Sequence, residues 1–264
     1  GAKIKMYLLG TASGIPTEKR YNESVALAVG ENVYLLDAGE PCSATLIRKC
    51  IDYNKIKAIF ISHMDADHFA GIPVLIQTME IGGKRGNPIK LFLPEGVVEE
   101  VRKYLEMMYL MDEMLSFKVE FLPIKFNPVY EDKWINLFAY PNNHLESRFQ
   151  LKEKVIVDYP DIQMDSFSFC ITVGDNKKIV YTGDIENVQE LDAFIDGTDL
   201  LLTEMAHVEP EELFNYLSGK RVSKIVCVHI HPDWDDREKE CLLLSRKYLD
   251  DKVRIGYDGM ELEI

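Results

Sequence analysis

Short apolar runs alternate with amphipathic stretches along the whole chain. Apolar runs of about four to eight residues favour strands, whereas apolar residues recurring every three to four positions favour helices. The pattern predicts strands at 4–9, 24–29, 33–36, 58–61, 89–93, 117–121, 135–140, 167–173, 178–182, 200–203, 225–228 and 253–255. It predicts helices at 44–51, 95–109, 210–217 and 235–249, and a further helix opening at Gly71-Ile72-Pro73. The turn Gly174-Asp175-Asn176 predicts a hairpin.

The order of these elements indicates a layered α/β protein. The chain has 264 residues, enough for one large domain or at most two. It has no tandem repeat, low-complexity tract or Pro/Gly/Ser-rich linker, so we expect one domain over 1–264. The segment 148–165 has the weakest periodicity, and we expect a loop or insertion there.

Composition narrows the classes of partner. The chain carries 30 basic and 44 acidic residues, a net charge of −14. An acidic surface repels polyanions, so broad nucleic-acid binding is disfavoured and a small-molecule substrate is expected. No apolar run is long enough to cross a bilayer, and no membrane partner is expected. The five cysteines are scattered without a CxxC pair, which favours reduced thiols in the cytoplasm.

Side chains able to bind a metal follow several of the predicted strands. The apolar run ending at Ser62 leads into His63, and the run ending at Pro141 leads toward His144. Likewise 179–183 leads into Asp184, and 225–228 leads into His229. Sites in layered α/β proteins form where loops leave one edge of the sheets. Four such endings predict one convergent site.

The densest group of polar residues is His63-Met64-Asp65-Ala66-Asp67-His68. Four ligand-type side chains lie within six residues, and a short loop can offer alternate residues to each of two ions. Neutral imidazoles and carboxylates suit zinc, manganese and iron. This segment therefore predicts a metal site.

At these residues the chain resembles the metallo-β-lactamase superfamily of metal-dependent hydrolases, whose usual motif is His-x-His-x-Asp-His. The segments Leu36-Asp37-Ala38-Gly39 and Thr182-Gly183-Asp184 are also similar to family elements, in the expected order. The opening Leu9–Thr17 looks like that of the ribonuclease Z-like, phosphodiesterase branch. The resemblance covers nearly the whole chain. It implies a four-layer αββα sandwich with the site at one edge of two packed sheets.

The resemblance also implies a ligand set for two divalent ions. His63, Asp65 and His144 would bind the first ion, Asp67, His68 and His229 the second, and Asp184 would bridge them. Asp37 would support the ligands from behind. Two ions roughly 3.5–4 Å apart can share a bridging water and make hydroxide available near neutral pH. We therefore expect a dinuclear metal-dependent hydrolase.

Asp65 departs from the usual motif, because most relatives have a second histidine there. A carboxylate makes the first site harder and more anionic than an imidazole does. Ligand preference then favours manganese or iron over zinc.

The remaining candidates are less constrained by pattern. We expect Asp67 and His207 to be catalytic, with His207 protonating the leaving group; the alternative is that His207 caps the next helix. His231 is expected beside the ligands or facing substrate, and it is also the alternative ligand to His229. Arg20 is the expected substrate-binding residue, and Lys84, Arg85 and Arg148 are weaker candidates for binding an anion.

The function expected from these residues is cleavage of a small, anionic phosphodiester through the metal-bridging hydroxide. Two alternatives remain open at this point. The same metals serve hydrolysis of a lactone, thioester or other acyl compound, and the scaffold also suits a non-catalytic metal-binding or sensing protein. The insertion at 148–165 would roof the pocket or pack in a homodimer.

Overall fold

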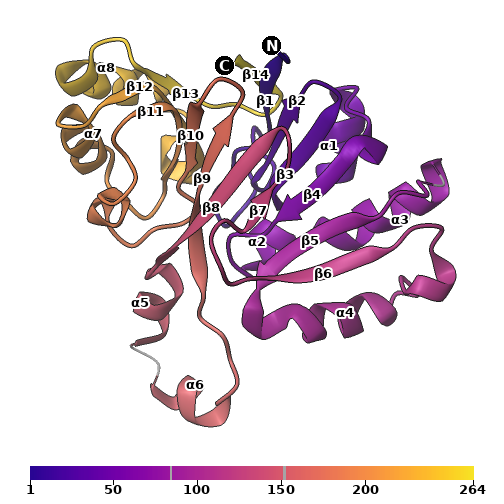
Figure 1. Ribbon diagram of the computed structural model, residues 1–264. Coiled ribbons are helices and arrows are strands. Elements are labelled where there is room, and N and C mark those ends of the chain that lie inside the picture. Colours follow the sequence, from indigo (N-terminus) through magenta and orange to yellow (C-terminus); the bar gives the residue numbers. More distant parts are fainter. Residues whose placement is uncertain (84, 151–152) are drawn as a thin grey trace.

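The structure, a computed structural model, describes residues 1–83, 85–150 and 153–264. Its strands form two mixed sheets that pack face to face (Figure 1). In spatial order the first sheet contains β14 (Met260–Glu263), β1 (Ile4–Gly10), β2 (Ser24–Val29), β3 (Asn32–Ala38), β4 (Ile56–Phe60), β5 (Ile89–Pro94) and β6 (Val119–Ile124). The second contains β13 (Val253–Ile255), β12 (Val222–Ile230), β11 (Thr198–Met205), β10 (Lys177–Tyr181), β9 (Ser166–Val173), β8 (Ile135–Asn142) and β7 (Tyr130–Glu131).

Helices cover the outer face of each sheet. Against the first sheet pack α1 (Cys42–Arg48), α3 (Ile72–Gly83) and α4 (Val98–Glu106), and the short α2 (Ala66–Phe69) lies at its edge. Against the second pack α7 (Pro210–Ser218) and α8 (Glu238–Leu249). Short 3-10 helices occur at Tyr53–Lys55, Glu95–Val97, Asp112–Met114, Val188–Leu191 and Pro232–Trp234. The predicted αββα sandwich is confirmed.

The two-residue repeat of the strands builds these layers. In β12, Val226 and Val228 enter the core between the sheets, whereas Ile225 and Cys227 enter the core beneath α7 and α8. Both faces of the strand are apolar because both are covered, as is usual for parallel strands between helices and a second sheet. This explains why the central strands appear in the sequence as continuous apolar runs.

Most predicted elements occur within a few residues of their expected bounds. The helix expected at 95–109 starts with a 3-10 turn and ends at Glu106, and the helix expected at 235–249 starts at Glu238. Strands β7 and β14 were missed because they are only two and four residues long. The segment 148–165 was expected to be a loop or insertion, and half of it lies in α5 (His144–Gln150) and α6 (Glu153–Asp158). The sequence pattern did not reveal these two short helices because the segment has the weakest periodicity in the chain.

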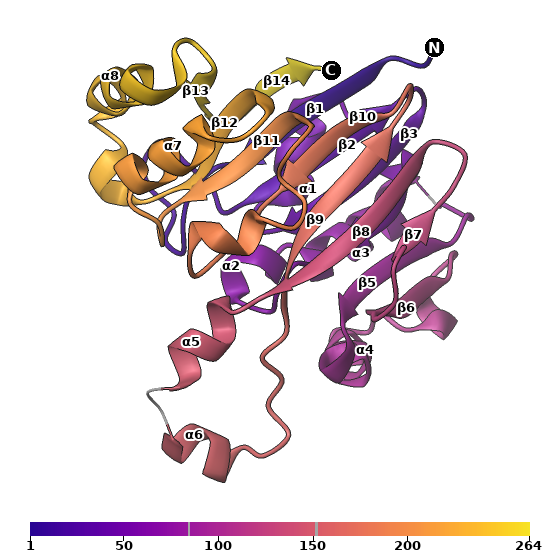
Figure 2. The same cartoon turned by 60° about the vertical axis from the view of Figure 1, so that its left-hand side comes forward.

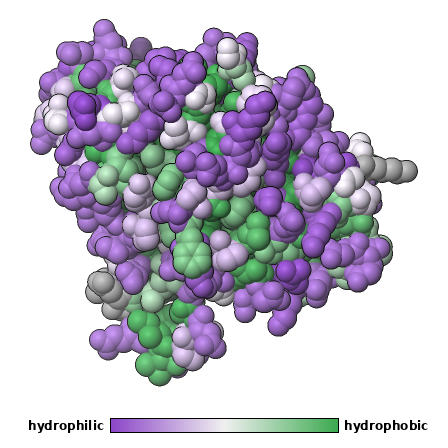
Figure 3. Space-filling view, viewed as in Figure 1, coloured by the Kyte–Doolittle hydropathy of each residue, from purple (hydrophilic) through white to green (hydrophobic). Residues whose placement is uncertain are grey.

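Helices α5 and α6 form an arm that projects from the sandwich in both ribbon views (Figures 1 and 2). Green, apolar atoms gather at its tip in Figure 3, where Ile156, Val157 and Tyr159 are exposed. The root of the arm begins at His144, directly beyond β8. The arm therefore joins an exposed apolar tip to the edge where the predicted site lies.

Several strands end at that edge. Strands β10, β11 and β12 are mutually parallel, as are β3 and β4, so their carboxyl ends meet on one side of the sandwich. Of the helices in the described ranges, none has the length and apolar character needed to cross a membrane.

Candidate metal centre

The first group of ligand-type atoms joins residues from both sheets. His63 Nε2 lies 3.3 Å from Asp65 Oδ2 and 3.3 Å from Asp184 Oδ2. His144 Nε2 lies 3.5 Å from each of the same two oxygens. These four side chains are the set expected for the first ion together with the bridging carboxylate.

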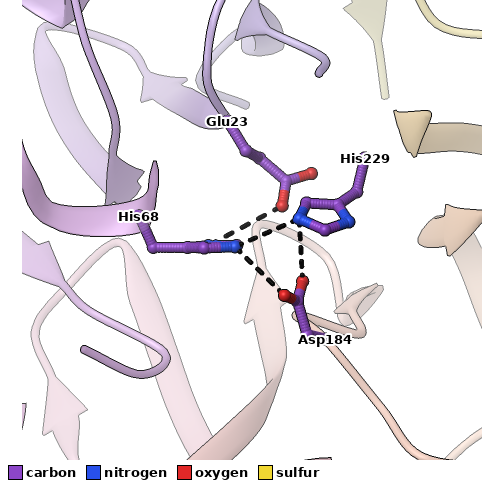
Figure 4. A group of neighbouring side chains, drawn as sticks. All are labelled: Glu23, His68, Asp184 and His229. Atoms are coloured by element: carbon purple, nitrogen blue, oxygen red, sulfur yellow. Dashed lines mark hydrogen bonds and ion pairs between the residues drawn. The ribbon is translucent and has the colours of Figure 1, made fainter. Parts of the chain in front are cut away.

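The second group surrounds the other side of Asp184. His68 Nε2 lies 3.2 Å from Asp67 Oδ2 and 3.3 Å from Asp184 Oδ2. His229 Nε2 lies 3.3 Å from Asp67 Oδ2 and 3.2 Å from Asp184 Oδ1. Figure 4 shows His68 and His229 converging on Asp184 from opposite sides. The two groups therefore share one carboxylate.

The donor atoms fit divalent ions. Zinc-type ions bind imidazole nitrogen and carboxylate oxygen at roughly 2.0–2.2 Å, which sets neighbouring ligands of a tetrahedral site about 3.4 Å apart. The contacts at Asp184 match that spacing. His68 Nε2 and His229 Nε2 also lie 3.3 Å apart. Two imidazole nitrogens approach this closely when they share a proton or a cation. The Nε2 atoms of His63 and His144 are buried without a hydrogen-bond partner.

Asp37 anchors two of these histidines from behind. Its Oδ2 lies 2.7 Å from His68 Nδ1, which directs His68 Nε2 toward the site. Ser62 Oγ donates to the same oxygen at 2.7 Å and lies 3.0 Å from His63 Nδ1. Asp37 is fully buried and also accepts a hydrogen bond from Tyr181. One carboxylate therefore fixes both His68 and, through Ser62, His63.

Glu23 is a buried site residue that the sequence did not point to. Its Oε2 lies 3.0 Å from the Tyr181 hydroxyl oxygen and 3.8 Å from His68 Nδ1 (Figure 4). Burial raises the pKa of Glu23 to about 7, against the lowering effect of His229 and His68. A signal was available: Glu23 directly precedes β2, whose residues are apolar on both faces, so a carboxylate there needs a buried partner.

Charge in the centre is tightly coupled. Burial opposes the charged form of His68, but Asp184 and Asp37 outweigh it and raise its pKa well above the ordinary value. Burial also opposes ionisation of Asp184, yet His229, His68 and His63 hold the pKa of its carboxyl well below the usual range. The ionised carboxylates are therefore stabilised by nearby positive charge. Protonated imidazoles provide this charge without metal, and divalent ions would provide it when they are bound.

His207 lies at the rim of the centre. Its ring centre lies 4.5 Å from that of His144, with the two rings tilted at 54°, and its Nδ1 lies 2.9 Å from Glu204 Oε1. Glu204 is buried and also accepts from the backbone nitrogens of Ile185 and His207. Burial lowers the pKa of His207, but the hydrogen bond to Glu204 outweighs this, and the pKa is raised. The Glu204 carboxylate, another residue without a predicted role, therefore fixes the orientation of the His207 ring through Nδ1.

Arg20 does not face a substrate pocket, so that prediction was wrong. The side chain is 2% exposed and its nitrogens donate to the Asp235 and Glu238 carboxylates, to Thr11 Oγ1 and to the Gly256 carbonyl. A guanidinium with these acceptors holds the opening loop against the C-terminal part of the chain. It has no capacity left for a substrate anion.

The other candidates outside the centre also have structural partners. His231 is the N-cap of the Pro232–Trp234 turn: its Nδ1 accepts from the Asp233 nitrogen, and its half-exposed ring contacts none of the described metal-type ligands. Its predicted place beside the ligands is therefore corrected. Arg85 donates to backbone carbonyls, including those of Asn54 and Pro88. Lys84 lies outside the described residues.

A family model matches this combination of fold and centre. The model described as "Anti-Pycsar protein Apyc1" matches residues 4–243. The chain belongs to this family. As the resemblance predicted, this Apyc1-family chain has the metallo-β-lactamase fold.

The similar proteins include ribonucleases Z. The Picrophilus torridus ribonuclease Z is 29% identical over 168 residues, which cover 63% of this chain and 53% of that protein. The chain thus matches about half the length of that relative. The Listeria welshimeri ribonuclease Z is 24% identical, with 99% of both chains covered.

Solved structures agree on the fold. The short form of human tRNase Z (ELAC1) superposes with a TM-score of 0.73 at 19% identity, covering 98% of both chains. The metallo-β-lactamase fold protein YhfI from Bacillus subtilis gives a TM-score of 0.76 at 16% identity, covering 99% of this chain and 100% of that one. A diphosphatase of the PhnP family gives 0.71 at 16% identity, covering 99% and 98%.

The relatives correct the expectation about partners. A small-molecule substrate was inferred, and nucleic acid disfavoured, from the net charge of −14. Relatives aligned over nearly the whole chain are named for cleaving RNA, so this inference was wrong. Net charge sums the entire surface, whereas a substrate meets a local field that bound cations dominate.

Proposed function

We propose that this chain is a metal-dependent phosphodiesterase that binds two divalent ions. His63, Asp65 and His144 would hold one ion, Asp67, His68 and His229 the other, and Asp184 both. The observation that carries the proposal is the position of Asp184, whose oxygens lie 3.2–3.5 Å from the Nε2 atoms of four histidines. Because Asp65 is a hard oxygen ligand, manganese or iron would be preferred over zinc.

Two divalent ions at this position would supply a bridging hydroxide at neutral pH and positive charge for the oxygens of the reacting phosphate. The residues of the chain contribute orientation and proton transfer. Asp37 fixes the tautomer and direction of His68, and Glu204 does the same for His207. Asp67 contacts both His68 and His229 and so sets how these two ligands face each other.

A proton donor completes the proposed reaction, since the oxygen that leaves phosphorus needs a proton. His207 is positioned for this step, because Glu204 occupies its Nδ1 and the ring lies at the rim in contact with the ring of His144. The names of the relatives support the bond type: ribonuclease Z and a PhnP-family diphosphatase both act at phosphorus.

The test is cleavage by chelator-treated protein reloaded with manganese, iron or zinc in turn. The substrates are bis-p-nitrophenyl phosphate, a cyclic nucleotide, a transfer-RNA precursor and a panel of lactones and thioesters. The proposal predicts metal-dependent cleavage of at least one phosphodiester and none without metal. Turnover of acyl compounds alone, or no turnover with any metal bound, would refute it.

Replacement of His207 by alanine should leave metal content unchanged. It should slow substrates with poor leaving groups by roughly 10²–10⁴-fold, because only those need the proton. Substrates with good leaving groups, such as p-nitrophenolate, should lose much less. His231→Ala is the matched control, a second half-exposed histidine outside the centre, and should change neither rate. Equal losses for both kinds of leaving group would remove His207 as the acid.

A further inference from the structure

We propose that Arg148 is a positioning residue for Asp65, and that the two side chains together replace the histidine usual at this place in the motif. The inference rests on the proposed metal centre and adds to it a residue of the projecting arm. Asp65 would then bind the metal ion well only while its carboxylate is paired with Arg148.

The contacts between the two side chains are bidentate. Arg148 Nη2 donates to Asp65 Oδ1 at 2.7 Å, and Nη1 donates to Oδ2 at 2.9 Å. The same Oδ2 lies 3.3 Å from His63 Nε2 and 3.5 Å from His144 Nε2. The carboxylate therefore faces the guanidinium on one side and the metal-type ligands on the other. A fork of this kind fixes the plane of the carboxylate.

Asp65 has little else to hold it. It occupies the N-cap position of α2, yet its side chain makes no capping hydrogen bond. An imidazole at this position would be stiff and would present one ligand atom. A carboxylate has two equivalent oxygens and can rotate between one-oxygen and two-oxygen coordination. Arg148 removes this freedom by occupying both oxygens, so that Oδ2 alone is directed at the ion.

The arginine is delivered by the same helix as a ligand. His144 and Arg148 are separated by four positions in α5 and therefore lie on one face of it. The guanidinium also lies 5.1 Å from the ring centre of Phe149. The root of the arm thus supplies both the third ligand of the first ion and the clamp on its second ligand.

The charge of Arg148 has two opposing effects on metal binding, and their relative sizes decide whether its removal weakens or strengthens that binding. Arg148 offsets the negative charge that Asp65 adds relative to a neutral imidazole, but it also repels a cation. Its side chain is 41% exposed, so solvent and salt screen that repulsion. The loss of orientation is not screened, and loss of a hydrogen-bond partner behind a metal ligand typically weakens binding by about 10- to 100-fold. Positioning should therefore outweigh repulsion.

The experiment compares six proteins: wild type, Arg148→Ala, Arg148→Lys, Asp65→His, the Asp65→His/Arg148→Ala double variant, and Arg237→Ala. Arg237 is a close control, since it also donates from two nitrogens to both oxygens of a carboxylate, Glu240, beside an aromatic ring and at similar exposure. Chelator-treated protein is titrated with Mn²⁺, and stoichiometry and affinity are read by calorimetry and elemental analysis.

Wild type and Arg237→Ala should bind two ions per chain. Arg148→Ala should bind one of the two about 10- to 100-fold more weakly. Removing Arg148 in the Asp65→His background should change affinity less than about two-fold, because the imidazole needs no clamp. Arg148→Lys, which keeps charge without the fork, should recover little of the affinity lost in Arg148→Ala.

Three outcomes would overturn the inference. Unchanged or tighter binding by Arg148→Ala would show that Arg148 does not position Asp65. A similar loss in both backgrounds would mean that Arg148 acts on the arm and not through Asp65. If wild type binds no metal, both the inference and the proposed function fail. If wild type and Arg148→Ala both bind two ions at equal affinity, only the inference fails.

Discussion

Replacing Asp184 with alanine is expected to reduce metal content from two ions to less than one per chain and to lower phosphodiester cleavage by at least about 10³-fold. Its Oδ2 lies within 3.5 Å of the Nε2 atoms of His63, His68 and His144, and its Oδ1 lies 3.2 Å from that of His229. Alanine would remove a ligand from both ions at once. It would also leave the buried imidazoles without the carboxylate that balances their charge.

Elemental analysis after gel filtration measures this loss. Asp236→Ala, at an exposed aspartate paired with Lys19, should keep wild-type metal content and activity. Asp184→Asn tests charge apart from shape, and it should also lose both ions, since a neutral amide oxygen is a poor bridge between cations. The turn before Asp184 depends on Gly183, which has a φ of +57° and no room for a side chain against the Phe167 carbonyl. Because Gly183 is unchanged in both variants, this turn should be retained. Two ions retained in Asp184→Ala would exclude the bridging role.

Replacing Asp37 with alanine should reduce both stability and metal affinity. The side chain accepts hydrogen bonds from the Ser62 nitrogen and hydroxyl and from Tyr181, and it contacts His68, all in the interior. Leaving these donors buried without an acceptor should cost about 3–5 kcal/mol of unfolding free energy in chelator. Free rotation of His68 and His63 should weaken metal binding by about 10- to 100-fold.

Urea unfolding in chelator and in saturating Mn²⁺ separates the two effects. Asp132→Ala is the control, because Asp132, like Asp37, accepts from tyrosine and backbone donors but lies between β7 and β8, away from the centre. It should lower stability equally in both conditions. Asp37→Ala should lower the metal-induced stabilisation as well. If both variants keep the full metal-induced gain, Asp37 does not position the ligands.

The sequence predicted the parts of the fold and centre that depend on local order. The His63–His68 cluster is contiguous, and His144, Asp184 and His229 each follow an apolar run that could only be a buried strand. Because parallel strands place their carboxyl ends on one edge, local pattern sufficed to bring these residues together.

What the sequence did not predict depends on pairs that are far apart in the chain. Arg20 was expected to bind a substrate anion, but its side chain pairs with Asp235, which is 215 residues away. Glu23 gains its role only from side chains that it meets across the sheets, whereas the pairing of Glu204 with His207, three residues away, depends on how the chain bends after β11. Arg148 belongs to a segment without a clear helical period, so its pairing with Asp65, 83 residues away, was hidden.

The centre draws its side chains from both sheets, and this has a consequence for synthesis of the protein. His63 to His68 follow β4 in the first sheet, whereas His144 and Asp184 follow strands of the second sheet and His229 lies near the end of β12 in that sheet. A chain growing on the ribosome holds four of the seven ligands once residue 68 has emerged, but it cannot close the second group until residue 229 has done so. An interrupted translation product would therefore lack hydrolytic capacity, and in the finished protein the bound ions would tie the first-made half of the sandwich to the last-made half.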